Sequence, residues 1–155
     1  YNESDAERVW TVHERALRAS QLTYHENAPA DDDIKDICKE YLDGDGEFLV
    51  GLAAGVIVAI GGFQGRGGDL VEIRRMRVHP SYQQRGYGEQ LLMALEDRAV
   101  RRGFDRSKLV TNAHLEAARN MYAKHGYSET RRETDTSTGH EFIHFEKELS
   151  RKADR

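Results

Sequence analysis

The chain has 155 residues, of which 32% are charged and 38% are apolar. This length suits one domain with one hydrophobic core. The formal net charge of −4 argues against a nucleic-acid binder, because such a protein needs a basic face. The longest apolar stretch, residues 48–63, is interrupted by glycines and is too short to span a bilayer, so we expect no membrane partner.

The cysteine and histidine residues limit the kinds of site that we expect in this chain. The single cysteine, Cys38, excludes an internal disulfide, and we read no secretory signal, so a cytoplasmic location is expected. Cys38 lies in a stretch whose apolar spacing predicts a helix facing the core, which favours a small buried hydrophobe over a catalytic thiol. The nearest histidine pair, His140 and His144, would span about 13 Å on a strand, so we predict no metal site.

The first half of the chain predicts two helices followed by three strands. Ser4 and Glu7 have capping-box spacing at the start of an apolar helical face. Aspartates open the second helical stretch and a glycine closes it. Pro80 ends the third strand, and Ala54-Gly55 would form a hairpin turn between the first two. The predicted helices are residues 4–20 and 31–46, and the strands lie within residues 47–64 and 70–80.

The second half alternates helices and strands. A leucine stripe predicts a helix that Gly103 terminates, and Gly126 ends a shorter one. The predicted helices are residues 86–103 and 115–126, and the strands are residues 107–113, 127–134 and 141–149. This order indicates a mixed α/β domain with helices packed on a sheet.

A glycine-rich turn before the third helix, Gln83 to Gly88, suggests an anion site. The first N–H groups of a helix lack intrahelical acceptors and carry the positive end of its dipole. Gly86 and Gly88 would let a phosphate approach the backbone, and Arg85 would add a charged fork. A dinucleotide fingerprint would need glycine where Leu91 stands, and no P-loop Gly-Lys-Ser/Thr is present. The alternative is a loop that merely turns the chain.

Two stretches resemble a known family. "EIRRMRVHPSYQQRGYGEQLL", residues 72–92, resembles the acetyl-CoA-binding motif of the N-acetyltransferases of the GNAT superfamily. "LVTNAHLEAARNMYAKHGY", residues 109–127, resembles the strand and helix that follow in the family, which usually end in a Leu-Tyr and a Gly-Phe pattern. The order of elements agrees over nearly the whole chain.

The resemblance implies a fold and an acetyl donor. The expected fold is a single domain over residues 1–155, with a mostly antiparallel central sheet, splayed middle strands and about four flanking helices. The family's first strand would precede Tyr1. Acetyl-CoA is the implied co-substrate, with its pantetheine arm beside the third strand and its pyrophosphate on the glycine turn. The implied binding residues are Met76, Arg77, Val78, Gln83, Gln84, Arg85, Gly86, Tyr87, Gly88 and Glu89.

The resemblance also implies catalytic residues. A backbone N–H near Met76 or Arg77 would stabilise an oxyanion. Tyr122 matches the family's general acid, and its alternative is a core aromatic on an apolar helix face. Glu72 lies at the offset of the base of histone-type members, and its alternative is a strand carboxylate paired with an arginine.

One position departs from the family pattern. Leu115 stands where many members carry an asparagine three residues before the alanine matched by Ala118. A hydrogen bond to pantetheine is then lost, or Asn112 or Asn120 supplies it.

The implied reaction is direct transfer of an acetyl group to a primary amine of a small molecule or peptide in a ternary complex. The alternative is a catalytically silent acyl-CoA-binding sensor or regulatory module. The first two helices and their loop would wall the acceptor side. The residues of this wall would be His13, Glu14, Tyr24, His25, Glu26 and Asp31 to Asp33. The run Asp31 to Asp33 would either attract a cationic amine or form a solvated helix start. Family members often dimerise, so a homodimer is among the expected assemblies, and no nucleic-acid partner is expected.

Overall fold

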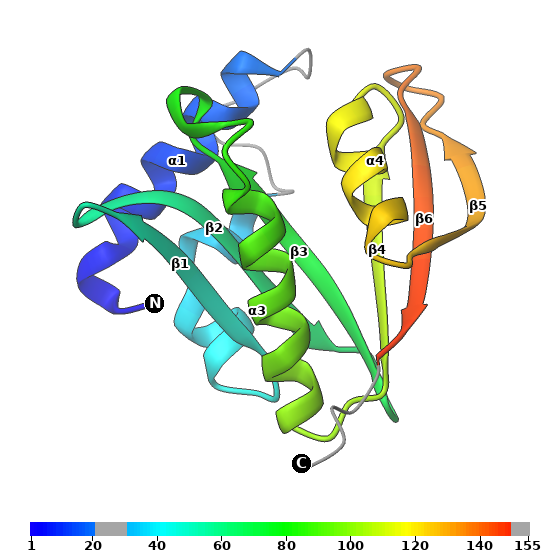
Figure 1. Ribbon diagram of the computed structural model, residues 1–155, viewed down its shortest axis with the longest axis horizontal. Coiled ribbons are helices and arrows are strands. Elements are labelled where there is room, and N and C mark those ends of the chain that lie inside the picture. Colours follow the sequence, from blue (N-terminus) through cyan, green and yellow to red (C-terminus); the bar gives the residue numbers. More distant parts are fainter. Residues whose placement is uncertain (21–30, 150–155) are drawn as a thin grey trace.

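A computed structural model describes residues 1–20 and 31–149, in which helices cover both faces of one twisted sheet (Figure 1). The six strands of this described part are ordered β1-β2-β3-β4-β6-β5. All neighbouring strands are antiparallel except β3 and β4. The strands are β1 (Glu47–Ala53), β2 (Val56–Gly65), β3 (Leu70–Val78), β4 (Arg106–Asn112), β5 (Ser128–Thr134) and β6 (Glu141–Glu148). The expected mixed, mostly antiparallel α/β fold is confirmed.

The helices also follow the predicted order. The longer ones are α1 (Ala6–Ala19), α3 (Tyr87–Arg101) and α4 (Glu116–Lys124). The short segments are η1 (Glu3–Asp5), α2 (Asp32–Lys35), the π-helical turn η3 (Cys38–Leu42) and η4 (Pro80–Tyr82). Gly103 and Gly126 follow α3 and α4 with φ of 93° and 90°, so both act as the predicted helix stops.

The N-terminal cap differs from the prediction. The side chain of Asn2 accepts a hydrogen bond from the Ser4 N–H at 3.2 Å, and Asp5 accepts one from the Asn2 N–H at 3.0 Å. The capping box therefore uses Asn2 and Asp5 rather than Ser4 and Glu7. Asparagine caps as well as serine does, so spacing alone could not choose between the two pairs.

The second predicted helix, residues 31–46, is broken. Asp36 leaves the helical region with φ −139° and ψ 66°, which separates α2 from η3. The break changes which side chains face the core: Ile37 and Tyr41 are buried, whereas Cys38 is half-buried and donates to a Glu3 carboxylate oxygen at 3.4 Å. The expectation that Cys38 is a core residue was therefore wrong.

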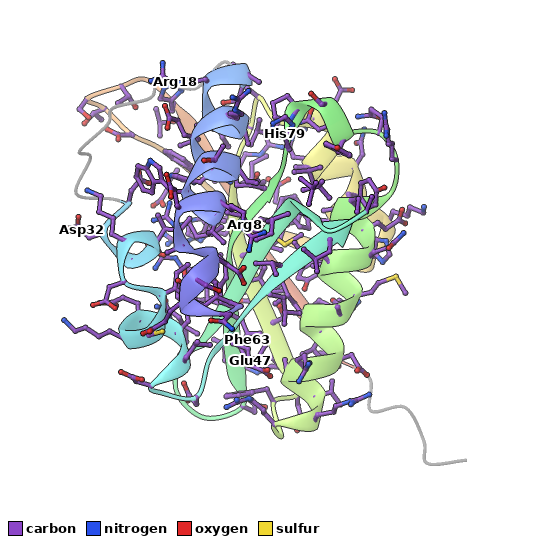
Figure 2. All side chains as sticks on the ribbon, turned by 90° about the vertical axis from the view of Figure 1, so that its left-hand side faces the viewer. Arg8, Arg18, Asp32, Glu47, Phe63 and His79 are labelled. Atoms are coloured by element: carbon purple, nitrogen blue, oxygen red, sulfur yellow. The ribbon has the colours of Figure 1, made fainter. Side chains whose placement is uncertain are left out.

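The hydrophobic core has one part on each face of the sheet. α3 packs across β1 to β3 on one face, with Leu92 and Leu95 fully buried. α1 and η3 cover the other face, where Val9, Val12 and Tyr41 pack (Figure 2). No helix in the described ranges is both long and apolar enough to cross a membrane.

The sheet opens between its two middle strands. β3 pairs with β4 only from Leu70–Glu72 to Arg106–Lys108, whereas β4 pairs with β6 as far as Asn112. Figure 1 shows β3 and β4 meeting at one end and diverging toward the other. A bulge in β3 lies at the divergence, where Arg75 has φ 61° and the register with β2 shifts. The expected splay of the middle strands is thus present.

The leucine stripe of α3 gives a test of this packing. We expect Leu95→Ala to lower the free energy of unfolding by about 3 kcal/mol, because it leaves a cavity between α3 and the sheet. Met93→Ala on the exposed side of the same helix, where Met93 is 55% exposed, should change it by less than about 0.5 kcal/mol. Urea unfolding of both variants measures this, and equal losses would contradict the packing.

Candidate active site

A cavity of about 490 Å³ lies where β3 diverges from β4. Its walls come from the end of β3, the loop and first turn of α3, the start of α4 and the last turn of α1. This single cavity brings together residues that the sequence separates by more than a hundred positions. The predicted residues that line it are Met76, Arg77, Val78, Gln83, Gln84, Gly86, Tyr87, Gly88, Glu89 and Tyr122.

The loop before α3 exposes a row of backbone N–H groups. Gln84 and Gly86 have φ of 63° and 83°, and Gly86 is the N-cap of α3 without a side-chain cap bond. The N–H groups of Tyr87, Gly88 and Glu89 lie in the first turn, where no intrahelical acceptor exists. A Cβ on Gly88 would be in ordinary van der Waals contact with Val78 at 3.5 Å and Met121 at 3.6 Å, so Gly88 lies directly on the cavity wall. This cradle fits a diphosphate.

The edge of β3 offers a second set of backbone groups. The His79 N–H donates to the Val58 carbonyl of β2 at 2.8 Å. Because successive N–H groups of a strand point to opposite sides, the N–H groups of Val78 and Met76 face the gap toward β4. An extended chain laid in this gap would find hydrogen-bond partners along β3, as the pantetheine arm of acetyl-CoA requires.

Tyr122 lies where the two sets of backbone groups meet. Its side chain is 5% exposed, packs against Phe145 with ring centroids 6.2 Å apart, and lines the cavity. Among the described residues, its hydroxyl has no hydrogen-bond partner. Burial raises the pKa of Tyr122 to about 12, although the positive charge of Arg77 partly opposes this shift. The phenol is therefore protonated at neutral pH.

Three of the predicted binding residues use their side chains within the protein. The Gln83 amide donates to the Val78 carbonyl at 3.1 Å and so holds the loop against β3. Arg85 lies over the Tyr82 ring, 5.4 Å from its centroid, and does not line the cavity. Glu89 accepts from Lys124 and bonds the His125 ring, each at 2.7 Å, and these hydrogen bonds lower its pKa. Glu89 thus joins the first turn of α3 to the end of α4.

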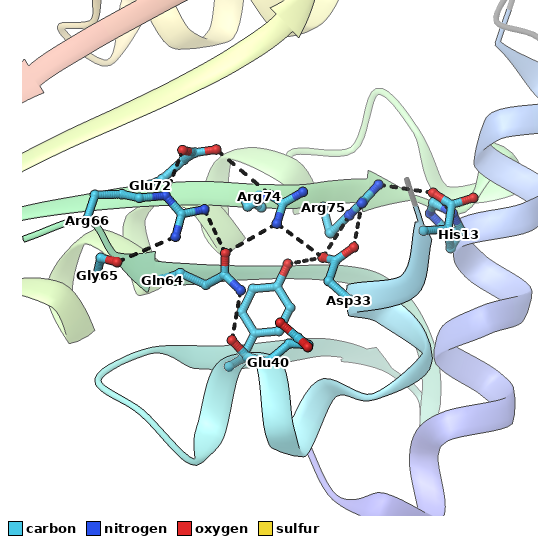
Figure 3. Close-up of polar contacts among 11 residues, drawn as sticks. His13, Asp33, Glu40, Gln64, Gly65, Arg66, Glu72, Arg74 and Arg75 are labelled. Atoms are coloured by element: carbon cyan, nitrogen blue, oxygen red, sulfur yellow. Dashed lines mark hydrogen bonds and ion pairs between the residues drawn. The ribbon is translucent and has the colours of Figure 1, made fainter. Parts of the chain in front are cut away.

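Glu72 lies outside this cavity, in a polar cluster on the α1 face of the sheet (Figure 3). Its carboxylate is 3.0 Å from the Nε of Arg66, 3.8 Å from Arg74 and 3.7 Å from the Nζ of Lys108. Three cations therefore surround the carboxylate that the family resemblance implies as a base.

Several cavity residues were not anticipated from the sequence. Ala16, Leu17 and Ser20 close the cavity from the end of α1, and Met121 lines it from α4. No local pattern marks these residues, because only the packing of α1 and α4 against the sheet places them there. Tyr24, His25 and Glu26, which belong to the predicted acceptor wall, lie outside the described residues.

The candidate substitutes for the missing family asparagine do not line the cavity. The Oδ1 of Asn112 accepts from the His114 N–H at 2.9 Å, which fixes the turn before α4. Asn120 is exposed on α4. As for metals, no group of three or more His, Cys, Asp or Glu side chains suited to an ion occurs within residues 1–20 and 31–149.

Comparison with known sequences points to one family. The family model described as acetyltransferase (GNAT) family matches residues 10–127. A mycothiol acetyltransferase from Pseudarthrobacter chlorophenolicus is 39% identical over 63 residues. That match covers 41% of this chain and 19% of the length of that enzyme.

Comparison with solved structures agrees. A GNAT-family acetyltransferase from Staphylococcus aureus Mu50 has a TM-score of 0.83 at 18% identity, over 97% of this chain and 96% of that one. The acetyltransferase yncA from Salmonella typhimurium, solved with its cofactor acetyl-CoA, has a TM-score of 0.80 at 17% identity, over 99% of this chain and 94% of its own. These similarities establish the fold.

The cradle predicts a matched pair of variants. Gly86 and Gly103, at opposite ends of α3, both have positive φ, and a Cβ at either would contact nothing within 4 Å. Valine at either position meets the same backbone strain of about 1–2 kcal/mol. We expect only Gly86→Val to weaken CoA binding, by about tenfold or more, because its side chain obstructs the cradle. Isothermal titration with CoA measures this, and equal affinities of the two variants would refute the site.

Proposed function

Because the chain belongs to the acetyltransferase (GNAT) family, whose members use acetyl-CoA, we propose that it transfers an acetyl group to a primary amine of a small molecule or protein. The observation that carries the proposal is the position of the Tyr122 phenol. It lies in the same cavity as the glycine cradle of α3 and the open edge of β3. A binding function alone would need the cradle but no proton donor at the gap.

Residues of the chain would hold acetyl-CoA in position for direct transfer to an amine. The N–H groups of the α3 first turn would bind the diphosphate, and the backbone of Met76 and Val78 would hold the pantetheine arm. Acetyl-CoA, when bound, supplies the acetyl thioester. The Met76 N–H, directed into the gap, would stabilise negative charge that develops on the acetyl oxygen. This arrangement needs no covalent intermediate on the protein.

As the C–N bond forms and the C–S bond breaks, Tyr122 would donate its proton to the departing thiolate. The amine nitrogen loses one proton as it becomes the amide, and this proton, passed through solvent, would restore the phenol. A pKa of about 12 keeps the phenol protonated, which a donor requires, but makes it a weak acid. Burial would likewise raise the pKa of the departing thiol, whereas the positive charge of Arg77 would favour the thiolate.

For Glu72, we propose an organising role. The Glu72 carboxylate lies outside the cavity and is already bound by three cations, so it is not placed to take a proton from an amine there. Its carboxylate would instead hold Arg66, Arg74 and Lys108 in place on the α1 face of the sheet.

Substitution of two tyrosines tests the proposed proton donor. We expect Tyr122→Phe to lower kcat about 10² to 10³-fold while CoA affinity is unchanged, because only proton transfer is lost. Tyr127→Phe is the matched control, since Tyr127 is also buried and its hydroxyl bonds Ser107 and Glu96 away from the cavity. The wild-type pH–rate profile should show no falling limb at about pH 10, where a free tyrosine ionises.

Steady-state acetylation of an amine panel, with thiol release as the readout, measures these effects. Full activity of Tyr122→Phe would remove the proposed acid. Tight CoA binding by the wild type without turnover of any amine would indicate the catalytically silent acyl-CoA-binding module.

Glu72→Gln tests the organising role separately. We expect kcat to stay within about threefold of wild type and thermal stability to fall, because a charge that pairs three cations is lost. A drop in kcat of about 10² or more, with the low-pH limb of the pH–rate profile abolished, would instead assign proton removal to Glu72.

A further inference from the structure

A second, smaller cavity of about 70 Å³ adjoins the candidate active site. It lies in the gap between β3 and β4 and is lined by three arginines of β3, Arg74, Arg75 and Arg77. Residues shared by both cavities form the junction between them; they are Met76, Arg77, Leu115, Ala118 and Tyr122. A group bound in the small cavity would therefore lie beside the proposed proton donor.

Two of the three arginines are neutralised by buried acids (Figure 3). The Nε of Arg75 donates to Asp33 at 3.0 Å, and its other nitrogens bond Asp33 and Asp31. Burial would raise the pKa of Asp33, but hydrogen bonds from Arg75 and Tyr41 outweigh it, so the pKa is lowered and the carboxylate is ionised. Arg74 lies 3.7 Å from Asp33 and 3.8 Å from Glu72.

These contacts also bear on whether the run Asp31 to Asp33 can attract a cationic amine. Asp31 and Asp33 are 6% and 9% exposed, and their carboxylates already form ion pairs with Arg75 of β3. Only Asp32 points to solvent, at the margin of the protein in Figure 2. Asp31 and Asp33 are therefore not available to attract a cationic amine.

Arg77 differs from its two neighbours. No carboxylate of the described residues lies within ion-pair distance of its guanidinium. One nitrogen donates to the carbonyl of Met76 at 3.0 Å, and the enclosed Nε has no acceptor. A cation removed from water without a counter-ion is costly, so a structure that keeps one there normally pairs it with an anion.

The negative charges nearest to Arg77 are Asp31 and Asp33, which act on it from beyond ion-pair distance and are both already paired with Arg75. Burial lowers the pKa of Arg77, and the positive charge of Arg75 lowers it further, yet a guanidinium stays protonated in proteins. His13, fully buried beside Asp31, has its pKa lowered by burial and by Arg77, so it is uncharged at neutral pH. At the junction, Arg77 is therefore a cation that no carboxylate of the described residues pairs directly.

We propose that Arg77 binds an anionic group of the acceptor, so that the preferred acceptor is a small amine with a carboxylate near its nitrogen, as in an α-amino acid. This inference rests on the proposed acetyl transfer. The diphosphate of CoA has its own cradle at α3, which leaves the Arg77 fork for the second substrate. A guanidinium fork suits a carboxylate because two parallel N–H groups match its two oxygens.

The test compares acceptors that differ only in this charge. The kcat/KM values of glycine and alanine are compared with those of glycinamide and alaninamide, each corrected to the neutral amine. We expect the wild type to prefer the acids by about tenfold or more, and Arg77→Gln to reduce the acid-to-amide ratio by at least about tenfold. Arg77→Lys should give an intermediate acid-to-amide ratio, because it keeps the positive charge but loses the two parallel N–H groups of the guanidinium.

Arg119→Gln is the matched control. Its Nε is likewise buried without a partner, but Arg119 lies on α4 and lines neither cavity, so the ratio should equal that of the wild type. Thermal melting of each variant shows that it is folded, and CoA titration shows that it still binds CoA.

A binding readout separates this inference from the proposed function. N-acetylglycine and N-acetylglycinamide are titrated into the CoA complex, and only the former should bind in an Arg77-dependent way. Equal kcat/KM values of the wild type for the acids and the amides would overturn the inference and leave acetyl transfer intact. An equal loss of kcat/KM on both classes of acceptor in Arg77→Gln would do the same. CoA binding without turnover would refute acetyl transfer, and the titration would then still decide the role of Arg77.

Discussion

The separation of β3 from β4 beyond Glu72 is the constraint on which the rest of the structure depends. A continuous ladder between these strands would consume the backbone groups of Met76 and Val78 and fill the space now occupied by both cavities. The bulge at Arg75 reinforces the separation, because it turns Arg74 and Arg75 to the same face, where the buried acids hold them. Unpaired strand edges are normally protected from solvent or partners, so an open internal edge indicates a ligand that completes it.

Both sides of the gap are held rigidly by contacts away from it. On one side, the buried leucines of α3 fix the helix against β1 to β3 and so set the position of its N-terminus. On the other, Tyr127 bonds Ser107 and Glu96, and Lys147 bonds Glu96, which ties β4, α3 and β6 together. Glu89 bridges to the end of α4. The cradle and the phenol are thereby held in fixed positions, which would lower the cost of binding and of reaction in the proposed function.

The features predictable from the sequence were the local ones. The leucine stripe of α3, the glycine stops after α3 and α4, and the turn at Ala54-Gly55 each depend on neighbours in the chain, and each is found as predicted. The break at Asp36 and the cap at Asn2 were missed, because helical spacing and cap spacing are each compatible with more than one register.

The charge relations of the site could not be read from the sequence. The sequence shows five basic residues between Arg66 and Arg85, but only the fold pairs Arg66 with Glu72 and Arg75 with Asp31 and Asp33, across separations of up to 44 positions. The same pairing leaves Arg77 without a carboxylate among the described residues. Tyr122 could be placed by family resemblance, whereas its burial and raised pKa follow from packing against β6.

Amide hydrogen exchange, resolved to single residues by NMR with and without CoA, tests the central claim most directly. If an extended ligand completes the open edge of β3 and its diphosphate lies on α3, CoA will slow exchange at Met76, at Val78 and from Gln84 to Glu89. The N–H of His79, already bonded to β2, will be protected in both states. Saturating CoA that leaves the exchange at Met76 and Val78 unchanged would contradict the account.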